Sequence, residues 1–411
     1  MKKIILLLLS IGLLIACRKS EANQLMIEQE IEEVEQTELT LLWSAISHPD
    51  TASCSSITPI VYKDNVIYSR KVCEEGEVFE MRNTRTGDLV WQWDHFVIPD
   101  EAAYHGGVRL YEDKLVICLL HEIYVLDVET GQTIWQTVLE HPIRGDYRIN
   151  VFDGYIYHVH RPPGNRVPYL HIVRSPIHTP AWDTIYTLRI EEGANPFFDS
   201  PAFYKTDFGE TYMVFNEKYY DFPNSQSKTN LSCFNLTGDS LVWQVKNFND
   251  FAHVSEPLVV EDRVYVAGHR SIYCFSVFDG ELLWYYDFPN SRETFAAAPF
   301  LVEGNRLIVK PDNSHIYAFD KRNGQILWMN DEVGESCDDL VYYEGIIYFT
   351  CIGSKYLHGV EIENGKELWR QLPPNYNQGY YFGTSGLAIH TGLGHLYATT
   401  WKEILCYDLS K

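Results

Sequence analysis

The sequence predicts an all-β protein, an eight-bladed β-propeller, and three observations support this fold class. A short apolar segment that ends in Trp recurs six times behind a Gly turn. Eight alternating apolar runs, each broken by a polar or Gly-containing turn, form a second series. The last repeat lacks its Trp segment, and a matching one, Leu41-Leu42-Trp43, lies near the N-terminus. A four-stranded unit repeated at this length is typical of a propeller.

The Gly and Trp series fixes the length of one blade. Its copies are Thr86–Trp91, Thr130–Trp135, Thr237–Trp243, Asp279–Trp284, Asn323–Trp328 and Asn364–Trp369. Adjacent copies place their tryptophans 41 or 44 residues apart, the length of a four-stranded blade. The interval between Trp135 and Trp243 is 108 residues, which has room for two blades with insertions. We expect Trp182 to mark a degenerate copy there that has lost its Gly turn.

The hairpin series counts blades independently. The hairpins are Val61–Tyr68, Leu110–Ile117, Val151–Tyr157, Phe203–Phe215, Val259–Val266, Leu301–Val309, Val341–Tyr348 and Ile389–Tyr397. The eighth is followed by one further strand, Ile404–Asp408, and no Trp segment. We therefore expect the N-terminal strand to complete the C-terminal blade, which would leave no gap in the ring.

The N-terminus predicts export and a lipid anchor. Residues 1–16 combine Lys2 and Lys3 with an apolar run that is too short to span a bilayer as a helix. The segment Leu14-Ile15-Ala16-Cys17 resembles a bacterial lipobox, which implies lipidation of Cys17. An ordinary signal peptide with an incidental Cys is the alternative. Residues 17–38 are acidic and predict a tether, and residues 39–411 form the propeller.

Composition restricts the partners. The chain has 33 basic and 56 acidic residues, a formal net charge of −23, and 45% hydrophobic residues. A disordered chain would hold fewer apolar residues, and a field of this sign repels phosphate backbones. We expect a folded monomer that binds no nucleic acid and contacts the membrane only through its lipid.

The repeat resembles the pyrroloquinoline-quinone-like repeat of quinoprotein-type propellers. The resemblance rests on the Gly-x-x-x-Trp segment and on preceding strands such as Ile123–Asp127 and Ile316–Asp320. It implies a quinoprotein alcohol dehydrogenase-like fold in which each Trp docks one blade onto the next. The dehydrogenases of that superfamily hold their cofactor over two adjacent cysteines, and this sequence has no such pair. We therefore expect no cofactor and no quinone-dependent activity.

The central funnel is the candidate ligand site. Polar residues precede the innermost strands of several blades, namely His105, Arg144, Asp146, Asp199, His253, Glu256, Asp338 and Asp339. Such a set of carboxylates, imidazoles and a guanidinium suits a cation, a glycan or a peptide. A merely solvated channel is the simpler interpretation, and we assign no metal.

Two functions from different classes fit these observations. The first is a membrane-anchored, non-catalytic scaffold for protein–protein interaction at the envelope of a Gram-negative bacterium. The chain is similar to the propeller lipoproteins of the outer-membrane barrel-assembly machinery, which implies an outer-membrane location and envelope protein partners. The alternative is a ligand-binding or enzymatic propeller that acts on glycans or a quinone through the funnel.

The cysteines divide into two groups. Cys233, Cys274 and Cys406 occupy one equivalent position on the third strand of their blades, where blade six has Ala318. We expect these three to be free and to fill space between blades, and Cys118 has no evident partner.

The remaining cysteines of the propeller predict two disulfides. Cys54 and Cys73 are equidistant from the Lys63-Asp64 turn, and Cys337 and Cys351 are equidistant from Glu344. Opposite residues of antiparallel strands lie within bridging distance. Peptide mapping without reduction should therefore recover Cys54 linked to Cys73 and Cys337 linked to Cys351. Four free thiols, or links between the two blades, would contradict this pairing.

Overall fold

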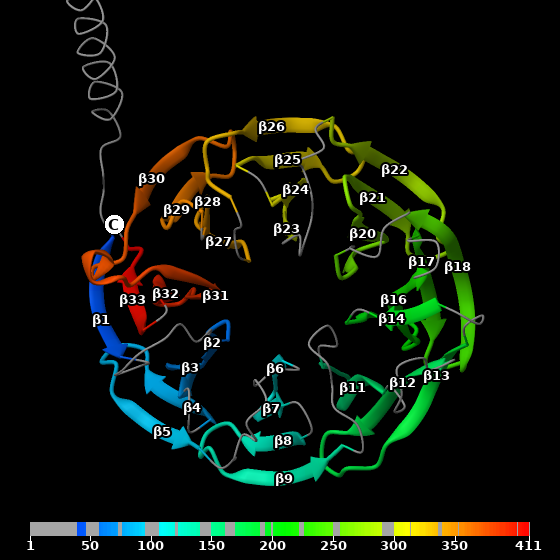
Figure 1. The fold of residues 1–411 in the computed structure, drawn as a ribbon, viewed down its shortest axis with the longest axis horizontal. Helices are drawn as coiled ribbons and strands as arrows, with labels where there is room; N and C mark the ends of the chain where they lie inside the picture. Colours follow the sequence, from blue (N-terminus) through cyan, green and yellow to red (C-terminus); the bar gives the residue numbers. More distant parts are fainter. Residues whose placement is uncertain are drawn as a thin grey trace, which may run out of the picture.

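The computed structural model describes residues 39–46, 57–72, 76–94, 107–119, 122–139, 149–160, 169–189, 194–198, 200–221, 226–249, 255–289, 300–312, 314–335, 339–351, 353–400 and 402–410. They form eight antiparallel sheets arranged as a ring, with the first strand of each near the centre and the last on the rim (Figure 1). The predicted fold class is confirmed. The predicted signal peptide, Cys17 and the acidic tether lie outside the described residues.

Strand bounds follow the predicted hairpin series. Blade one comprises β2 (Ile60–Tyr62), β3 (Asn65–Val72), β4 (Gly76–Asn83) and β5 (Leu89–Trp93). Blade two comprises β6 (Gly107–Tyr111), β7 (Lys114–Cys118), β8 (Glu122–Asp127) and β9 (Thr133–Val138). Blade three comprises β10 (Asn150–Phe152), β11 (Tyr155–His160), β12 (Tyr169–Pro176) and β13 (Asp183–Arg189).

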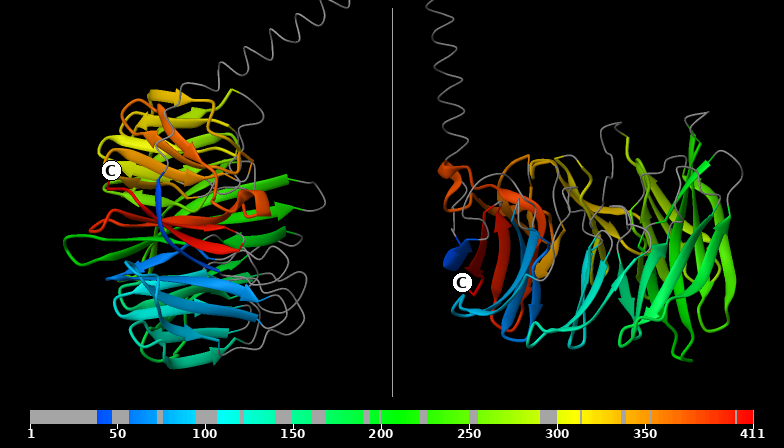
Figure 2. Two further views of the ribbon diagram at one scale, coloured as in Figure 1. Left: turned by 90° about the vertical axis from the view of Figure 1, so that its left-hand side faces the viewer. Right: turned by 60° about the horizontal axis from the view of Figure 1, so that its bottom comes forward.

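Blade four has a fifth strand. It comprises β14 (Ala194–Phe198), β15 (Ala202–Lys205), β16 (Thr211–Asp221), β17 (Gln226–Asn235) and β18 (Ser240–Asn249). Both β14 and β15 pair with β16, one on each half of its length. Its three outer strands are long and project beyond the neighbouring blades (Figure 2).

The remaining blades return to four strands. Blade five comprises β19 (Leu258–Val260), β20 (Arg263–Ala267), β21 (Ser271–Ser276) and β22 (Leu282–Asp287). Blade six comprises β23 (Phe300–Glu303), β24 (Arg306–Val309), β25 (Ile316–Asp320) and β26 (Ile326–Asn330). Blade seven comprises β27 (Val341–Tyr343), β28 (Ile346–Thr350), β29 (Leu357–Glu361) and β30 (Glu367–Gln371), followed by a 3₁₀ turn, η1 (Tyr376–Gln378).

The ring closes through its termini, as the sequence predicted. Blade eight comprises β31 (Phe382–His390), β32 (His395–Thr400), β33 (Glu403–Asp408) and the N-terminal strand β1 (Thr40–Ile46). Strand β1 pairs antiparallel with β33, and Trp43 lies opposite Cys406. The outermost strand of the last blade is therefore the first strand of the chain.

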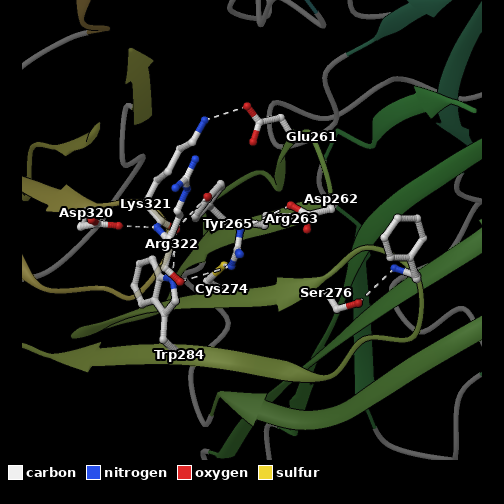
Figure 3. Close-up of polar contacts among 11 residues, drawn as sticks. Glu261, Asp262, Arg263, Tyr265, Cys274, Ser276, Trp284, Asp320, Lys321 and Arg322 are labelled. Atoms are coloured by element: carbon white, nitrogen blue, oxygen red, sulfur yellow. Dashed lines mark hydrogen bonds and ion pairs between the residues drawn. The ribbon is translucent and has the colours of Figure 1, made fainter. Parts of the chain in front are cut away.

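Tryptophan indoles join successive blades. Within the described residues, six indole N–H groups donate a hydrogen bond to a backbone carbonyl of the next blade. The pairs are Trp43 to Thr84, Trp91 to Val128, Trp135 to Ile177, Trp243 to Val277, Trp284 to Lys321 and Trp328 to Ile362, at 2.8–3.1 Å. Figure 3 shows one such carbonyl, that of Lys321, which also accepts a bond from the Tyr265 hydroxyl at 3.0 Å.

The accepting residue is itself fixed within its own blade. The N–H of Lys321, for example, donates to the carbonyl of Asn305 in the first hairpin turn of blade six, at 3.0 Å. Thr84, Val128, Ile177, Val277 and Ile362 make the equivalent bond. The carbonyl that accepts each indole bond thus belongs to a residue whose own N–H is already bonded to the first hairpin turn of its blade.

The turn glycines are required by these tryptophans. Gly324 has φ +71°, and a Cβ at this residue would lie 2.5 Å from the Trp284 ring. Gly87, Gly131, Gly280 and Gly365 also have positive φ and face the Trp of the preceding blade. Any side chain here would combine left-handed backbone strain with a steric clash.

Blade three departs from this pattern. Trp182 lies just before β13 and packs edge-on against His158, so it does not dock onto blade four. Blade three is therefore the expected degenerate copy without a Gly turn, and Trp182 marks its outer strand, but another residue docks it onto blade four. The first residue after the bulge of β13, the place of Trp in other blades, is Tyr186. Its hydroxyl donates to Glu217 of blade four at 2.7 Å.

The cysteine positions agree with the repeat. Cys233, Cys274 and Cys406 lie opposite Trp243, Trp284 and Trp43, and Ala318 lies opposite Trp328. All three, and Cys118, are free and buried, as expected. Burial raises the pKa of Cys233 and Cys406 to about 12, so these thiols are unreactive at neutral pH.

Only one of the four cysteines in the two predicted disulfides, Cys351, lies within the described residues. Cys351 is disulfide-bonded, and its sulfur also contacts the carbonyl of Val333. Cys54, Cys73 and Cys337 lie outside the described residues. The two pairings therefore stay predictions.

The Gly and Trp contact predicts the effect of a single methyl group. Gly324→Ala should lower the free energy of unfolding by about 2 to 4 kcal/mol, because backbone strain and the contact with Trp284 add. Gly238→Ala is the matched control, since Gly238 follows the blade without a docking Trp and has no positive φ. Chemical denaturation should show a loss below about 1 kcal/mol for the control. Equal losses in the two variants would contradict the role of the Trp contact.

Candidate functional site

The two ends of the ring differ in their connections. At one end, which we call the turn face, short turns join the first and second strands and the third and fourth strands of the blades. Lys63, Glu112 and Glu261 adopt positive φ in such turns. At the opposite end, the loop face, the second strand of a blade leads to the third and each blade leads to the next, and η1 lies there between β30 and β31. Loops on a rigid scaffold are a usual location of binding residues.

Most of the predicted funnel residues lie outside the described residues. These are His105, Arg144, Asp146, Asp199, His253 and Asp338. Glu256 and Asp339 are described, and both are exposed just before the innermost strands β19 and β27. The residues before Asp199 form β14 (Ala194–Phe198), an additional strand that the hairpin series did not predict. Among the described residues, no group of three or more potential ligands is placed to hold a metal.

A buried carboxylate, Glu217, joins blades three and four. Its side chain is fully buried. It accepts hydrogen bonds from hydroxyl and amide groups on β13 and on three strands of its own blade, β16, β17 and β18. The donors are Tyr186, Tyr219, Asn230, Ser232 and Gln244, at 2.7–3.2 Å. Burial, followed by the charge of Glu217, raises the pKa of Tyr186 and of Tyr219. Both oxygens of this carboxylate already accept hydrogen bonds, so Glu217 holds the long strands of blade four together and is not available to a ligand.

A second polar group, centred on the buried His358, has the connectivity of a catalytic triad. The Ser354 hydroxyl lies 2.8 Å from Nε2 of His358, and Nδ1 of His358 lies 2.6 Å from Oε1 of Glu367. The sequence analysis missed this group, because its members are joined only by the fold of blade seven. The same connectivity activates serine nucleophiles in hydrolases.

The surroundings of Ser354 assign this group a structural role. His358 is fully buried and stacks on Phe349 at 5.1 Å between ring centroids. A Cβ at Gly334 would lie 2.7 Å from the Ser354 hydroxyl, so the backbone of that loop covers the serine. The N–H groups on either side of it, those of Gly353 and Lys355, already donate to backbone carbonyls. They are therefore not free to stabilise an oxyanion.

A buried lysine lies near the same junction of blades six and seven. Lys310 is 2% exposed, and its ammonium donates to the carbonyl of Pro311 at 3.0 Å. Burial lowers the pKa of Lys310 to about 7, although Asp312 and Glu335 oppose the shift. The charge of Lys310 in turn contributes to the lowered pKa of His358, whose main cause is burial.

The tyrosines near η1 are covered by cations of the same chain. The ammonium of Lys355 lies 4.6 Å from the ring centroid of Tyr381, and that of Lys402 lies 5.1 Å from Tyr380. Tyr376 packs edge-on against Tyr381 at 5.3 Å. These contacts occupy the ring faces, so the tyrosines support the connection between blades seven and eight.

The comparisons with known proteins agree with this fold. The family model described as outer membrane protein assembly factor BamB matches residues 227–408. The crystal structure of BamB from Moraxella catarrhalis covers 87% of this chain and 98% of its own, with 14% identity and a TM-score of 0.58. Quinohemoprotein alcohol dehydrogenase from Comamonas testosteroni covers 90% of this chain and 76% of its own, with 10% identity and a TM-score of 0.62.

The computationally designed Ika8 protein aligns equally well. It covers 90% of this chain and 98% of its own, with 12% identity and a TM-score of 0.60. No curated protein sequence matches the chain. At these identities the structural likeness shows the fold alone. The chain is an eight-bladed propeller whose residues 227–408 match this family model and whose fold resembles that of BamB.

Buried histidines predict how stability depends on pH. His158 is 4% exposed, its Nδ1 has no hydrogen-bond partner among the described residues, and burial lowers its pKa to about 4. Because the unfolded chain binds the proton near pH 6.5, protonation favours unfolding. The free energy of unfolding should therefore fall between about pH 6.5 and pH 4, by about 3 kcal/mol for this residue alone.

Thermal melts across this pH range test the assignment. His158→Phe should remove about one proton from the uptake that accompanies unfolding, and so flatten the dependence of Tm on pH. His178→Phe, at an exposed position of the same blade, is the control and should leave the slope unchanged. An unchanged slope in His158→Phe would show that another group dominates the acid response.

Proposed function

We propose that this chain is a membrane-anchored, non-catalytic scaffold that takes part in outer-membrane protein assembly in a Gram-negative envelope. The observation that carries the proposal is the match of residues 227–408 to the family model described as an outer membrane protein assembly factor. The alignment of this chain with the BamB structure covers 98% of the BamB chain. The proposed location also draws on the lipobox at Cys17, which lies outside the described residues.

The polar groups of the described residues fit a scaffold. Glu217 and His358 are buried and hydrogen-bonded within the protein, and the half-buried Ser354 and Glu367 are the partners of His358. Their effect is to hold neighbouring blades and loops in place. Within the described residues, no helix is long and apolar enough to cross a membrane. The proposed anchor is a lipid at Cys17.

A quinone-dependent oxidoreductase is the second candidate, because a quinohemoprotein alcohol dehydrogenase shares the fold at a similar TM-score. The sequence has no adjacent cysteine pair of the kind expected beneath that cofactor. The scaffold is therefore the function that we favour.

Affinity purification from detergent-solubilised outer membranes tests the proposal. The tagged full chain should fractionate with the outer membrane and recover components of the barrel-assembly machinery. In the matched variant, the leader of a secreted periplasmic protein replaces residues 1–17, and we expect that chain in the soluble periplasmic fraction. Recovery of no assembly component by the anchored chain would contradict the proposed role. Unchanged membrane retention of the variant would contradict the proposed anchor.

A further inference from the structure

The repeat provides an internal reference, because equivalent residues of different blades can be compared. One such position lies in the turn after the third strand, directly after the residue whose carbonyl accepts the Trp indole. It is charged and exposed in blades one, two, six and seven, as Arg85, Glu129, Arg322 and Glu363. In blade five the residue is Phe278, which is 67% exposed.

Two of the charged residues at this position pair with the preceding blade. Glu129 forms an ion pair with Lys63, and Glu363 forms one with Arg306. In the blade that precedes Phe278, the first hairpin turn has Phe208, which is 95% exposed, and the nearby cation Lys205 pairs with Asp153 of blade three instead. The hydroxyl of Tyr204 donates to the carbonyl of Val277 at 3.4 Å, so these two turns are neighbours. Exposed aromatic rings therefore occupy a junction that is equivalent to the site of an ion pair at two other junctions.

The outermost strands of blades five and six also have exposed apolar residues where other blades have polar ones. The residue after the Trp is polar in the other blades that have the Trp, as Ser44, Gln92, Gln136, Gln244 and Arg370. In β22 it is Tyr285, 58% exposed, and in β26 it is Met329, 49% exposed. The preceding Leu283 and Leu327 are also exposed by more than two fifths. Strands β22 and β26 are neighbours on the rim (Figure 1).

We define the rim patch as Phe208, Phe278, Leu283, Tyr285, Leu327 and Met329. Each of these side chains is 41–95% exposed. Clustered apolar exposure beyond a few hundred Å² is typical of interaction sites, and exposed aromatic residues supply much of the binding energy in such sites. The blade comparison shows that the propeller fold does not require Phe278, Tyr285 or Met329 to be apolar.

Charge and strand geometry define the occupant. Acidic residues border the patch, including the exposed Asp207, Asp279 and Glu281. The hydroxyl of Ser276 and the amide of Glu281 lower the pKa of Asp279, so this carboxyl is ionised at neutral pH. Among the described strands, β22 pairs only with β21, and its sequence, Leu-Leu-Trp-Tyr-Tyr-Asp, contains no Lys, Arg or Pro that would discourage pairing at its open edge.

We propose that the rim patch binds an extended segment of a partner protein, in which apolar residues alternate with Lys or Arg, by strand addition to the open edge of β22. The backbone of the segment pairs with β22, its apolar side chains contact Phe278 and Tyr285, and its cations face the acidic border. This site is on the rim, away from the funnel and the loop face, and does not depend on the proposed role at the outer membrane.

Fluorescence anisotropy with three labelled peptides tests the proposal. The first peptide alternates Lys with Leu, Val and Phe, the second has Glu in place of Lys, and the third is the first with alternate backbone N-methylation. The protein is the full chain with its leader exchanged as above. The Lys peptide should bind at micromolar concentrations, and the Glu and N-methylated peptides should bind at least tenfold more weakly.

Variants locate the site and separate apolar contact from charge attraction. Phe278→Glu and Tyr285→Glu should each weaken binding of the Lys peptide at least tenfold, although each adds a negative charge. Gln92→Glu, at the position in blade one equivalent to Tyr285, is the matched control and should bind as the unmodified chain does. Tm values show that each variant is folded.

Several results would overturn the proposal. These are no binding of the Lys peptide, equal binding of the Glu or N-methylated peptide, or unchanged binding by both rim variants. Equal loss in Gln92→Glu would show that any added charge has the same effect. Self-association of the chain that Tyr285→Glu abolishes in analytical ultracentrifugation would assign the patch to a second copy and not to a partner.

Discussion

The hydrogen bond from a Trp indole to a carbonyl of the next blade is the contact on which the ring depends. It fixes the angle between neighbouring sheets, because the carbonyl belongs to a residue already bonded to its own hairpin turn. The bulge before the Trp turns the indole toward the next blade, and the glycine in the turn of that blade leaves room for the indole. Bulge, Trp and Gly therefore form one unit, which explains why they recur together in the sequence.

The junction of blades three and four shows what replaces this unit. Tyr186 takes the place of Trp after the bulge, and its hydroxyl binds the carboxylate of Glu217 instead of a backbone carbonyl. Gly238, in the next blade, accordingly has no Trp above it. The buried carboxylate collects donors from several strands, so a network of side chains replaces a single bond. This junction coincides with the longest strands of the molecule.

Much of the fold could be predicted because the repeat is local in sequence. The spacing of the tryptophans gave the blade length, and Leu41-Leu42-Trp43 gave the closure. The role of Tyr186 could not be predicted, because it depends on the register of β13 against β12. The Ser354, His358 and Glu367 group was missed because a strand register and a hairpin turn bring these residues together. Of the predicted funnel residues, only Glu256 and Asp339 are described; they lie just before β19 and β27, and the ligand site stays a prediction.

The closure by β1 has a consequence for how the chain folds. Thr40 pairs with Asp408, so a strand that is synthesised early has to wait for a partner that is synthesised last. Until then the sheet of blade eight lacks its outer strand, and the Thr84 carbonyl lacks its indole donor. Among the described strand pairs, these two segments are the farthest apart in sequence, so joining them carries the largest loop-closure entropy. The last step of folding is therefore a long-range one, and until it is complete the open ring exposes strand edges that can pair with other chains.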